Sequence, residues 1–246
     1  MEKKTVKQGV LSGSMLKLIA CLSMLIDHIG AAVVYPLIFE SRYFEFHRSF
    51  AGFSSQELLE IYQWMRLIGR LAFPIYCFLL AEGYFHTKSP RKMASRLFLF
   101  ALVSEIPFDL AFRRVWFYPQ HQNVFFTLGL GFLAVWGHDH FKKKSPQSPK
   151  GLLALLAAMG AAHLLHTDYS WFGVGLIFIF YFWRERPLQC TLAAFFACLW
   201  QSAALPALIL IRLYNGKRGS RIKYAFYLFY PLHLTLLYGV FLHLSK

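Results

Sequence analysis

The chain has 246 residues, of which 57% are hydrophobic and only 15% charged, and it contains 26 phenylalanines. This composition excludes an intrinsically disordered protein and is poorly suited to a soluble globular domain. A formal net charge of +14 would indicate nucleic-acid binding in a soluble protein. Because several apolar runs approach the roughly 20 residues that cross a bilayer, we assign the charge to basic cytoplasmic loops and expect no nucleic-acid partner.

Apolar runs of helical length predict an all-α polytopic membrane protein, with about nine transmembrane helices in one bundle and a single domain over residues 1–246. The expected spans are Met15–Pro36, Met65–Phe85, Met93–Phe112, Asn123–His138, Gly151–His166, Tyr169–Trp183 and Tyr224–Leu244. The run Leu188–Ile211 is either one long tilted helix or two short helices hinged near Gln201–Ala204. Between the first two spans, Glu40–Tyr62 is expected to form an external loop with a short helix capped at Ser54-Ser55-Gln56-Glu57.

The distribution of basic residues predicts the topology. With the N-terminus inside, the segments Lys88–Arg96, Lys142–Lys150, Arg184–Arg186 and Arg212–Lys223 are all cytoplasmic if Leu188–Ile211 crosses twice. The C-terminus is then outside, and the pair Arg113-Arg114 is the one clear exception to the rule. The segment Met1–Gly13 is basic but has no cleavage site after a short apolar core, so we expect no removable signal peptide.

The first span carries ionisable residues at membrane depth, where they are costly and generally mark a functional interior. Lys17 and His28 are 11 residues apart, which places them within about 20° of one helix face and roughly 16 Å apart along the axis. Asp27 lies about 100° away from His28 around the helix, so the two are not automatically a hydrogen-bonded pair. This face predicts a path from a basic residue near one membrane surface to a histidine inside the bundle.

Other spans contribute polar residues that the predicted topology gathers near the outer surface. They are Arg66 and Arg70, Glu105 and Asp109, Asn123 and Thr127, His163, and Asp168 with Tyr169, while His233 lies nearer mid-membrane. We expect Arg66 or Arg70 to pair with Glu105 or Asp109, because a buried charge needs a partner. Glu82 and His86, one helical turn apart, are read as an interfacial pair or a catalytic one.

No pattern in the chain predicts a metal site. His163 and His166 are three residues apart, but no carboxylate or cysteine completes a ligand set. Cys21, Cys77, Cys190 and Cys198 all fall in apolar runs without a Cys-x-x-Cys spacing, which favours packing roles.

Several motifs resemble the TraX family of bacterial membrane proteins, the F-pilin acetylases and their relatives. The matching stretches are Leu16-Lys17-x-Ile19-Ala20 followed by Met24-x-Ile26-Asp27-His28-Ile29-Gly30, Arg66-x-Ile68-Gly69-Arg70-Leu71-Ala72-Phe73-Pro74-Ile75, Glu82-Gly83-Tyr84-Phe85-His86-Thr87, Ser104-Glu105-Ile106-Pro107-Phe108-Asp109-Leu110, Gln122-Asn123-Val124-Phe125-Phe126-Thr127-Leu128, Asp168-Tyr169 with Gly173-Val174, Tyr214-Asn215-Gly216, and Phe229-Tyr230-Pro231-x-His233-Leu234. TraX in turn resembles a wider group of inner-membrane acyltransferases whose first helix carries arginine, ten residues, then histidine. Here Lys17 replaces the arginine, which removes its bidentate geometry, while His28 keeps its place.

The resemblance implies a multi-pass protein of the bacterial cytoplasmic membrane that transfers an acetyl group from acetyl-CoA to an acceptor protein or glycan. In the best-known members the acceptor is the N-terminal amine of pilin. For such a reaction, His28 is the expected base or acyl carrier, Arg70 the oxyanion donor, and Glu105 or Asp109 the orienting groups. Asp27 and His233 complete the candidate catalytic residues.

The phosphates of acetyl-CoA require basic residues near the cytoplasm. The candidates are Lys17, Lys88, Arg91, Lys92, Arg96 and Arg218, with Lys217, Arg221 and Lys223 as further members of the last basic loop. Two other classes of function use the same residues differently: a proton-coupled transporter would use the intramembrane His, Asp, Glu and Arg as a relay, and a pilus or envelope assembly factor would use them for structure.

Overall fold

The structure, a computed structural model, describes residues 9–39, 53–220 and 223–245. These residues form helices joined by short connections, with two isolated β-bridges and no strand among them. The helices are α1 (Gly13–Ile29), a π-helix (Gly30–Val34), α2 (Tyr35–Phe39), α4 (Ser55–Gly69), α5 (Ala72–His86), α6 (Pro90–Arg113), α7 (Val124–Lys144), α8 (Lys150–Leu164), α9 (Ser170–Phe182), α10 (Pro187–Cys198), a 3-10 helix (Leu199–Ala204), α11 (Pro206–Arg212) and α12 (Lys223–Leu244). The all-α prediction is confirmed.

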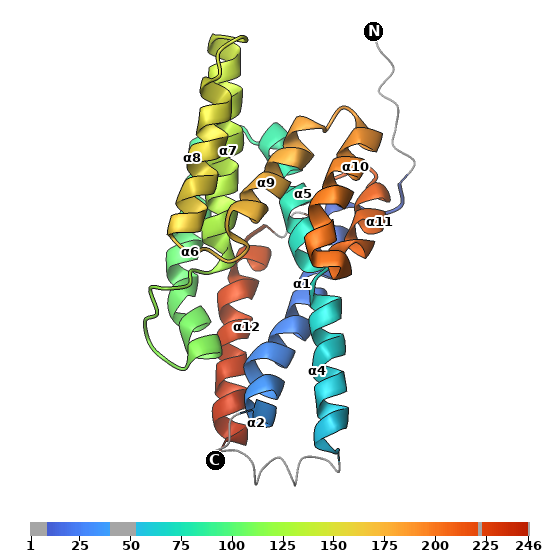
Figure 1. The fold of residues 1–246 in the computed structure, drawn as a ribbon, viewed down its shortest axis with the longest axis vertical. Coiled ribbons are helices and arrows are strands. Elements are labelled where there is room, and N and C mark those ends of the chain that lie inside the picture. The colour runs from blue at the N-terminus through green and yellow to red at the C-terminus, as the bar shows by residue number, and fades with distance from the viewer. Residues whose placement is uncertain (1–8, 40–52, 221–222, 246) are drawn as a thin grey trace.

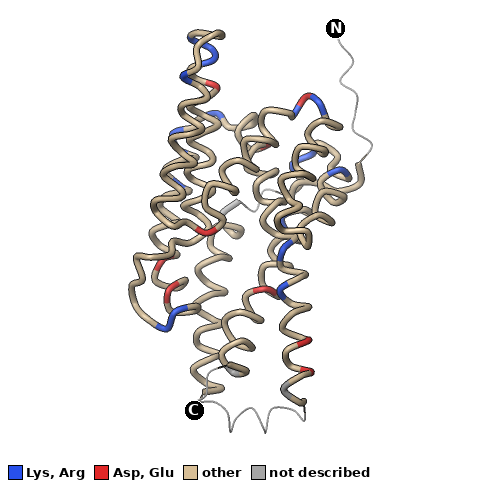
Figure 2. Tube along the Cα trace, in the orientation of Figure 1, with Lys and Arg blue, Asp and Glu red and all other residues tan. Residues whose placement is uncertain are grey.

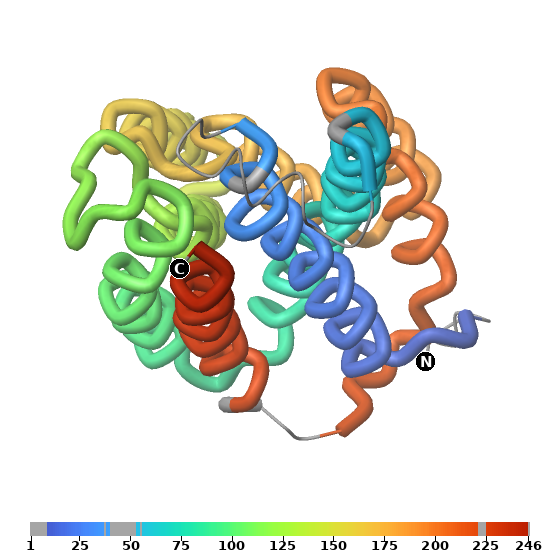
Figure 3. Tube along the Cα trace, turned by 90° about the horizontal axis from the view of Figure 1, so that it is seen from below, coloured from blue at the N-terminus to red at the C-terminus, as the bar shows by residue number. Residues whose placement is uncertain are grey.

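Helix α1 lies between α12 and α4 (Figure 1). Viewed from below, α1 passes between α12 on one side and α4 on the other, and it also contacts α5 (Figure 3). Around this centre, α12 packs on α6, while α7, α8 and α9 form a second group of mutually packed helices. Leu16 and Ala20 of α1 are fully buried, as expected for a helix with neighbours on several sides.

The second expected span differs from its prediction. Ser54 caps α4 by accepting from the backbone N–H of Glu57, and Glu57 accepts from the backbone N–H of Ser54, as the capping motif predicts. However, the helix does not end in a loop near Tyr62; it continues to Gly69 and meets α5 at a break over residues 70–71. Pro74 explains the position of the break, because its missing N–H leaves the carbonyl of Arg70 without a helical partner. Residues 40–52 of the expected external loop lie outside the described residues.

The run 188–211 forms two short helices and not one long tilted helix. Helix α10 ends at Cys198, Gln201 has non-helical dihedral angles, and α11 returns from Pro206 to Arg212 (Figure 1). The hinge is therefore where the sequence places it. At 1.5 Å per residue, the seven residues of α11 cover only about 10 Å, well short of a hydrocarbon core.

The segment before α1 and the segment before α12 are joined by backbone hydrogen bonds. Leu11 donates to Leu213, Gly13 to Lys217, and Ser14 to Arg218, at 2.8–3.0 Å. Gly219 has a positive φ of 75° and lies so close to Ser14 that a side chain would not fit. This pairing places the basic connection 213–220 beside the first turn of α1.

Among the described residues, three stretches are long and apolar enough to cross a membrane: Gly13–Val34, Gln56–His86 and Ala225–Leu244. Two shorter apolar helices are Lys150–Leu164 and Ser170–Phe182. Most Lys and Arg residues lie toward the end that holds the α7–α8 connection, and the last turn of α12 lies toward the other (Figure 2). These features are those of a membrane protein; the count of nine crossings and their orientation stay predictions.

Candidate functional site

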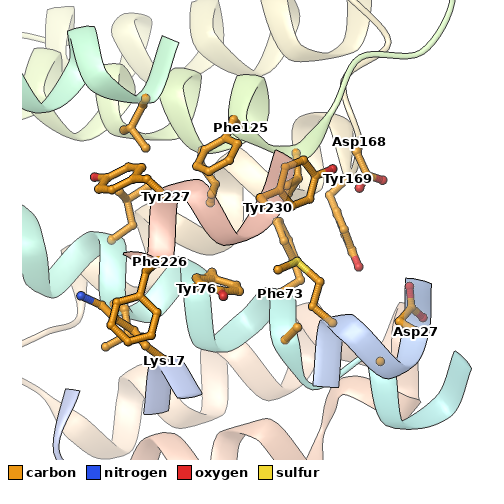
Figure 4. Close-up of a pocket in the computed structure, with 18 of the residues that line it drawn as sticks. Lys17, Asp27, Phe73, Tyr76, Phe125, Asp168, Tyr169, Phe226, Tyr227 and Tyr230 are labelled. Atoms are coloured by element: carbon orange, nitrogen blue, oxygen red, sulfur yellow. The ribbon is translucent and has the colours of Figure 1, made fainter. Parts of the chain in front are cut away.

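A cavity of about 960 Å³ extends between α1, α4, α5, α6, α12 and the α8–α9 connection. Lys17 and Phe226 lie at one end, whereas Asp27, Asp168 and Tyr169 lie at the other (Figure 4). The wall between the two ends is largely aromatic and includes Phe73, Tyr76, Phe125, Tyr227 and Tyr230. The cavity therefore joins a basic end to an end with both acids and bases.

His28 and His233 form the central pair of the second end. Their rings are 10° from parallel, and Nδ1 of His28 lies 2.7 Å from Nε2 of His233. Nδ1 of His233 lies 2.6 Å from the carbonyl oxygen of Phe229, which is only an acceptor, so this nitrogen carries the proton. In the neutral ring Nε2 of His233 is then an acceptor, and His28 donates to it from Nδ1. The lone pair of neutral His28 is consequently on Nε2.

Asp27 pairs with Arg66, and its carboxylate lies beside His28. Arg66 Nη1 donates to Asp27 Oδ2 at 2.6 Å, and the same oxygen is 4.0 Å from His28 Nε2. The Asp27 side chain also lies directly against Gly69, where a Cβ atom would overlap it. The glycine in α4 thus allows the aspartate of α1 to sit between the two helices.

Arg70 and the α8–α9 connection complete this end. The guanidinium of Arg70 interacts with Asp27, Asp168 and the hydroxyl of Tyr169, and Tyr169 stacks on Phe73 with ring centroids 3.5 Å apart. Asp168 lies in the connection outside the helices, and its burial raises its pKa to about 6, against the lowering effect of Arg70 and Arg66. Its carboxylate is also 4.0 Å from Nε2 of His121.

The basic end gathers cations from three parts of the chain. Lys17 lies over the ring of Phe226, and Arg218 is placed beside α1 by the pairing of residues 213–218. Lys88, in the α5–α6 connection, and Arg96, near the start of α6, also line the cavity. Among the described residues, no carboxylate pairs with Lys88, Arg96 or Arg218, and the buried Nε of Arg96 has no hydrogen-bond partner. The positive charge of Lys88, Arg96 and Arg218 is therefore not neutralised by a carboxylate of the described residues.

Comparison with known proteins agrees with the resemblance of the motifs. The family model described as TraX protein matches residues 12–241. The chain belongs to the TraX family. It is also 31% identical over 208 residues to the probable fimbrial assembly protein FimC, serogroup H1, of Dichelobacter nodosus, covering 72% of this chain and 82% of that relative. No solved structure matches the chain.

The structure brings together most of the candidate residues of this TraX-family chain. Asp27, His28 and Arg70 line the cavity, His233 lies directly behind His28, and four of the expected cations lie at the basic end. Arg91 and Lys92 are exposed on the first turn of α6 and do not line it. Arg221 lies outside the described residues, as does the side chain of Lys223.

Glu105 and Asp109 belong to a separate buried network, and the predicted pairing with the arginines is wrong. Glu105 accepts from the side chain of Asn123, and Asp109 accepts from the backbone N–H of Tyr118 at 2.7 Å. Arg66 is instead paired with Asp27 across α1 and α4. Neither carboxylate lines the cavity, so their orienting role has no support from their position. They hold the connection between α6 and α7.

Glu82 also has a partner that its spacing does not reveal. Arg184 Nε donates to Glu82 Oε1 at 2.8 Å, whereas His86 Nε2 is 3.8 Å from the other oxygen. Within the described part of the chain, no group of three or more His, Cys, Asp or Glu side chains is arranged to hold a metal ion.

Tyr169 and Asp168 are the site residues that reasoning from spacing did not assign. The sequence places both residues in a family motif and near the outer surface, but it predicts no chemical role for either. The available signal is a polar stretch, His166-Thr167-Asp168-Tyr169-Ser170, between two strongly apolar helices. In membrane proteins such a break between helices is tolerated where it lines a cavity.

Proposed function

We propose that this TraX-family chain is a multi-pass protein of the bacterial cytoplasmic membrane that transfers an acetyl group from acetyl-CoA to an amine or hydroxyl group. The observation that carries the proposal is the hydrogen bonding of His28 to His233, which leaves the lone pair of His28 on Nε2 at one end of a cavity. The other end of this cavity is lined by Lys17, Lys88, Arg96 and Arg218. A base and an anion-binding end joined by an aromatic wall suit a donor with phosphates at one end and a reactive thioester at the other.

Acetyl-CoA is proposed to bind with its phosphates at the basic end. Lys88, Arg96 and Arg218 would hold them. Lys17, on the same face of α1 as His28 but nearer the basic end, would add a point charge. The eleven residues from Lys17 to His28 correspond to roughly 16 Å along α1. That length leaves room for an extended arm between the phosphates and the acetyl group.

His28 is proposed to act as the general base. Its Nε2 takes the proton of the acceptor amine or hydroxyl while the acceptor nitrogen or oxygen forms a bond to the carbonyl carbon of the thioester. The carbon–sulfur bond then breaks, and His28 returns the proton to the CoA thiolate. Arg70 supplies positive charge beside the carbonyl oxygen, and Asp27 stabilises the imidazolium form of His28 from 4.0 Å.

The acceptor class is proposed from the comparison. The similarity to a fimbrial assembly protein favours a protein subunit of a surface fibre as the acceptor, with a glycan hydroxyl as the other acceptor to test. Both would reach the cavity from the end that holds Asp27, Arg66 and Asp168.

The test is acetyl transfer by purified protein in nanodiscs. Carbon-14-labelled acetyl-CoA is supplied with one of three acceptors: a short peptide with a free N-terminal amine, N-acetylglucosamine, or water alone. His28→Ala should bind acetyl-CoA as the parent does and lose a factor of about 10²–10⁴ in rate. His163→Ala is the matched control, because His163 is exposed at the end of α8 and does not line the cavity.

Two results would contradict the proposal. One is a His28→Ala rate within threefold of the parent. The other is a parent that neither binds acetyl-CoA nor transfers its acetyl group to any of the three acceptors. Proton flux in liposomes containing the same preparation would then favour the transporter.

His233 gives a second test of the same geometry. His233→Ala removes the acceptor that fixes the tautomer of His28, so the rate should fall by roughly 10²-fold with little change in the KM for acetyl-CoA. Added imidazole should restore part of the rate if the vacated space is filled. A loss of thermal stability with a normal rate per folded molecule would instead mean that His233 only packs.

A further inference from the structure

The α8–α9 connection has an unusual backbone. His166, Tyr169 and Ser170 have positive φ angles of 51°, 61° and 44°, although none of them is glycine. For side chains with a Cβ atom, each such residue costs on the order of 1–2 kcal/mol. Three of them within five residues are retained only if the surroundings impose the conformation.

Those surroundings are visible in the hydrogen bonds of the connection. Asp168 N–H donates to the carbonyl of Gln122 at 2.8 Å, and Gln122 N–H donates to the carbonyl of His166 at 3.1 Å. The Thr127 hydroxyl contacts the carbonyl of Asp168 and lies 3.0 Å from the hydroxyl of Thr167. The start of α7 thus holds the connection along its length.

The effect of this backbone is to place Tyr169 in the cavity. Its ring stacks on Phe73 with an interplanar angle of 6°, and it stands with Asp27 and Asp168 at the same end of the cavity (Figure 4). Gly173 follows one turn later, where a Cβ atom would overlap Phe73 and Thr127. The tyrosine is therefore fixed by its stack, its backbone and the absence of a side chain beside it.

The hydrogen bond of Tyr169 determines where its own proton points. Arg70 has only donors, so in their hydrogen bond the tyrosine oxygen is the acceptor. The hydroxyl proton is left to donate to another acceptor in the cavity. Nε2 of His28 lies 4.0 Å from Asp27, and Asp27, His28 and Tyr169 all line the cavity, so the base and this donor border the same space.

We propose that Tyr169 is a catalytic residue of the acetyl transfer, donating a hydrogen bond to the acetyl carbonyl oxygen as it becomes negatively charged. This inference rests on the proposed function. When the acceptor bonds to the carbonyl carbon, the carbonyl electron pair moves to the oxygen and is stabilised by the tyrosine O–H and the charge of Arg70. When the carbon–sulfur bond breaks, the pair returns, and Tyr169 keeps its own proton throughout.

The test compares Tyr169→Phe with Tyr181→Phe in the nanodisc assay with labelled acetyl-CoA. Tyr169→Phe keeps the ring and its stack but removes the hydrogen bond from Arg70, so acetyl-CoA binding should stay at the parent value while the melting temperature falls by a few degrees. Its kcat should fall by roughly 10²–10³-fold with the KM for acetyl-CoA within threefold, as for the loss of one oxyanion donor. Tyr181→Phe removes a hydroxyl from α9 outside the cavity and should leave the rate unchanged.

The outcomes separate this inference from the proposed function. A parent that transfers acetyl and a Tyr169→Phe variant within threefold of it would overturn the role of Tyr169 alone. A normal rate per folded molecule, or a lowered rate explained by a raised KM, would also overturn it, since a packing or binding role would suffice. A parent without transfer to any of the three acceptors would overturn both.

Discussion

Gly69→Ala tests the contact between α1 and α4 that positions Asp27 and His28 at one end of the cavity. A methyl group at position 69 would overlap the side chain of Asp27, and both residues lie on packed helices. Forcing a methyl group into such a contact costs about 1–3 kcal/mol. Displacing Asp27 from Arg66 adds about 1–3 kcal/mol, whereas replacing glycine in a helix returns about 1 kcal/mol. The expected net destabilisation is about 3 kcal/mol.

For a chain of this length, about 3 kcal/mol corresponds to a melting temperature roughly 6–12 °C lower. Melting by intrinsic fluorescence and acetyl transfer per folded molecule are measured on one preparation, and both should fall. Gly160→Ala is the matched control: Gly160 is exposed on α8 with nothing within 4 Å of an added Cβ, so melting should be unchanged or rise by a few degrees. A Gly69→Ala protein that melts within 2 °C of the parent and remains active would refute the close contact.

Three further predictions concern stability and topology. His166→Gly should stabilise the protein by about 1 kcal/mol in chemical unfolding, because φ of 51° favours glycine after a helix. Glu82→Gln should destabilise it by about 2 kcal/mol by weakening the buried pair with Arg184, whereas Glu185→Gln, with a side chain 85% exposed, should change stability by less than about 0.5 kcal/mol. A reporter enzyme active only outside the membrane should be active when fused after Lys246. An inactive but fully expressed fusion would mean that α12 crosses the membrane in the opposite direction.

Helix positions and the shared face of Lys17 and His28 were predictable because they depend on local patterns. The apolar runs predicted the helices and the Ser54 cap predicted the start of α4. For residues 188–211, two short helices hinged near Gln201 were one of the two alternatives. The spacing of Lys17 and His28 on one face of α1 correctly placed both along one cavity. Each of these follows from the 3.6-residue period or from a short motif.

Partner choice between helices was not predictable, because opposite charges in a sequence do not reveal which helices touch. Asp27, Glu105, Asp109 and Asp168 were all possible partners for Arg66, and only the packing of α4 on α1 selects Asp27. Likewise, nothing in the sequence indicates that residues 213–218 pair with the start of α1, because such backbone bonds do not depend on the side chains.

The hydrogen bonds behind His28 end at a backbone carbonyl. Nδ1 of His233 already donates to Phe229, and a carbonyl oxygen has no proton to pass on. A proton taken up by His28 therefore has no onward carrier along this route and must leave on the side from which it came. Each turnover would return the site to its starting protonation state without charge crossing the membrane. The two histidines can therefore hold a proton but do not pass it along this route.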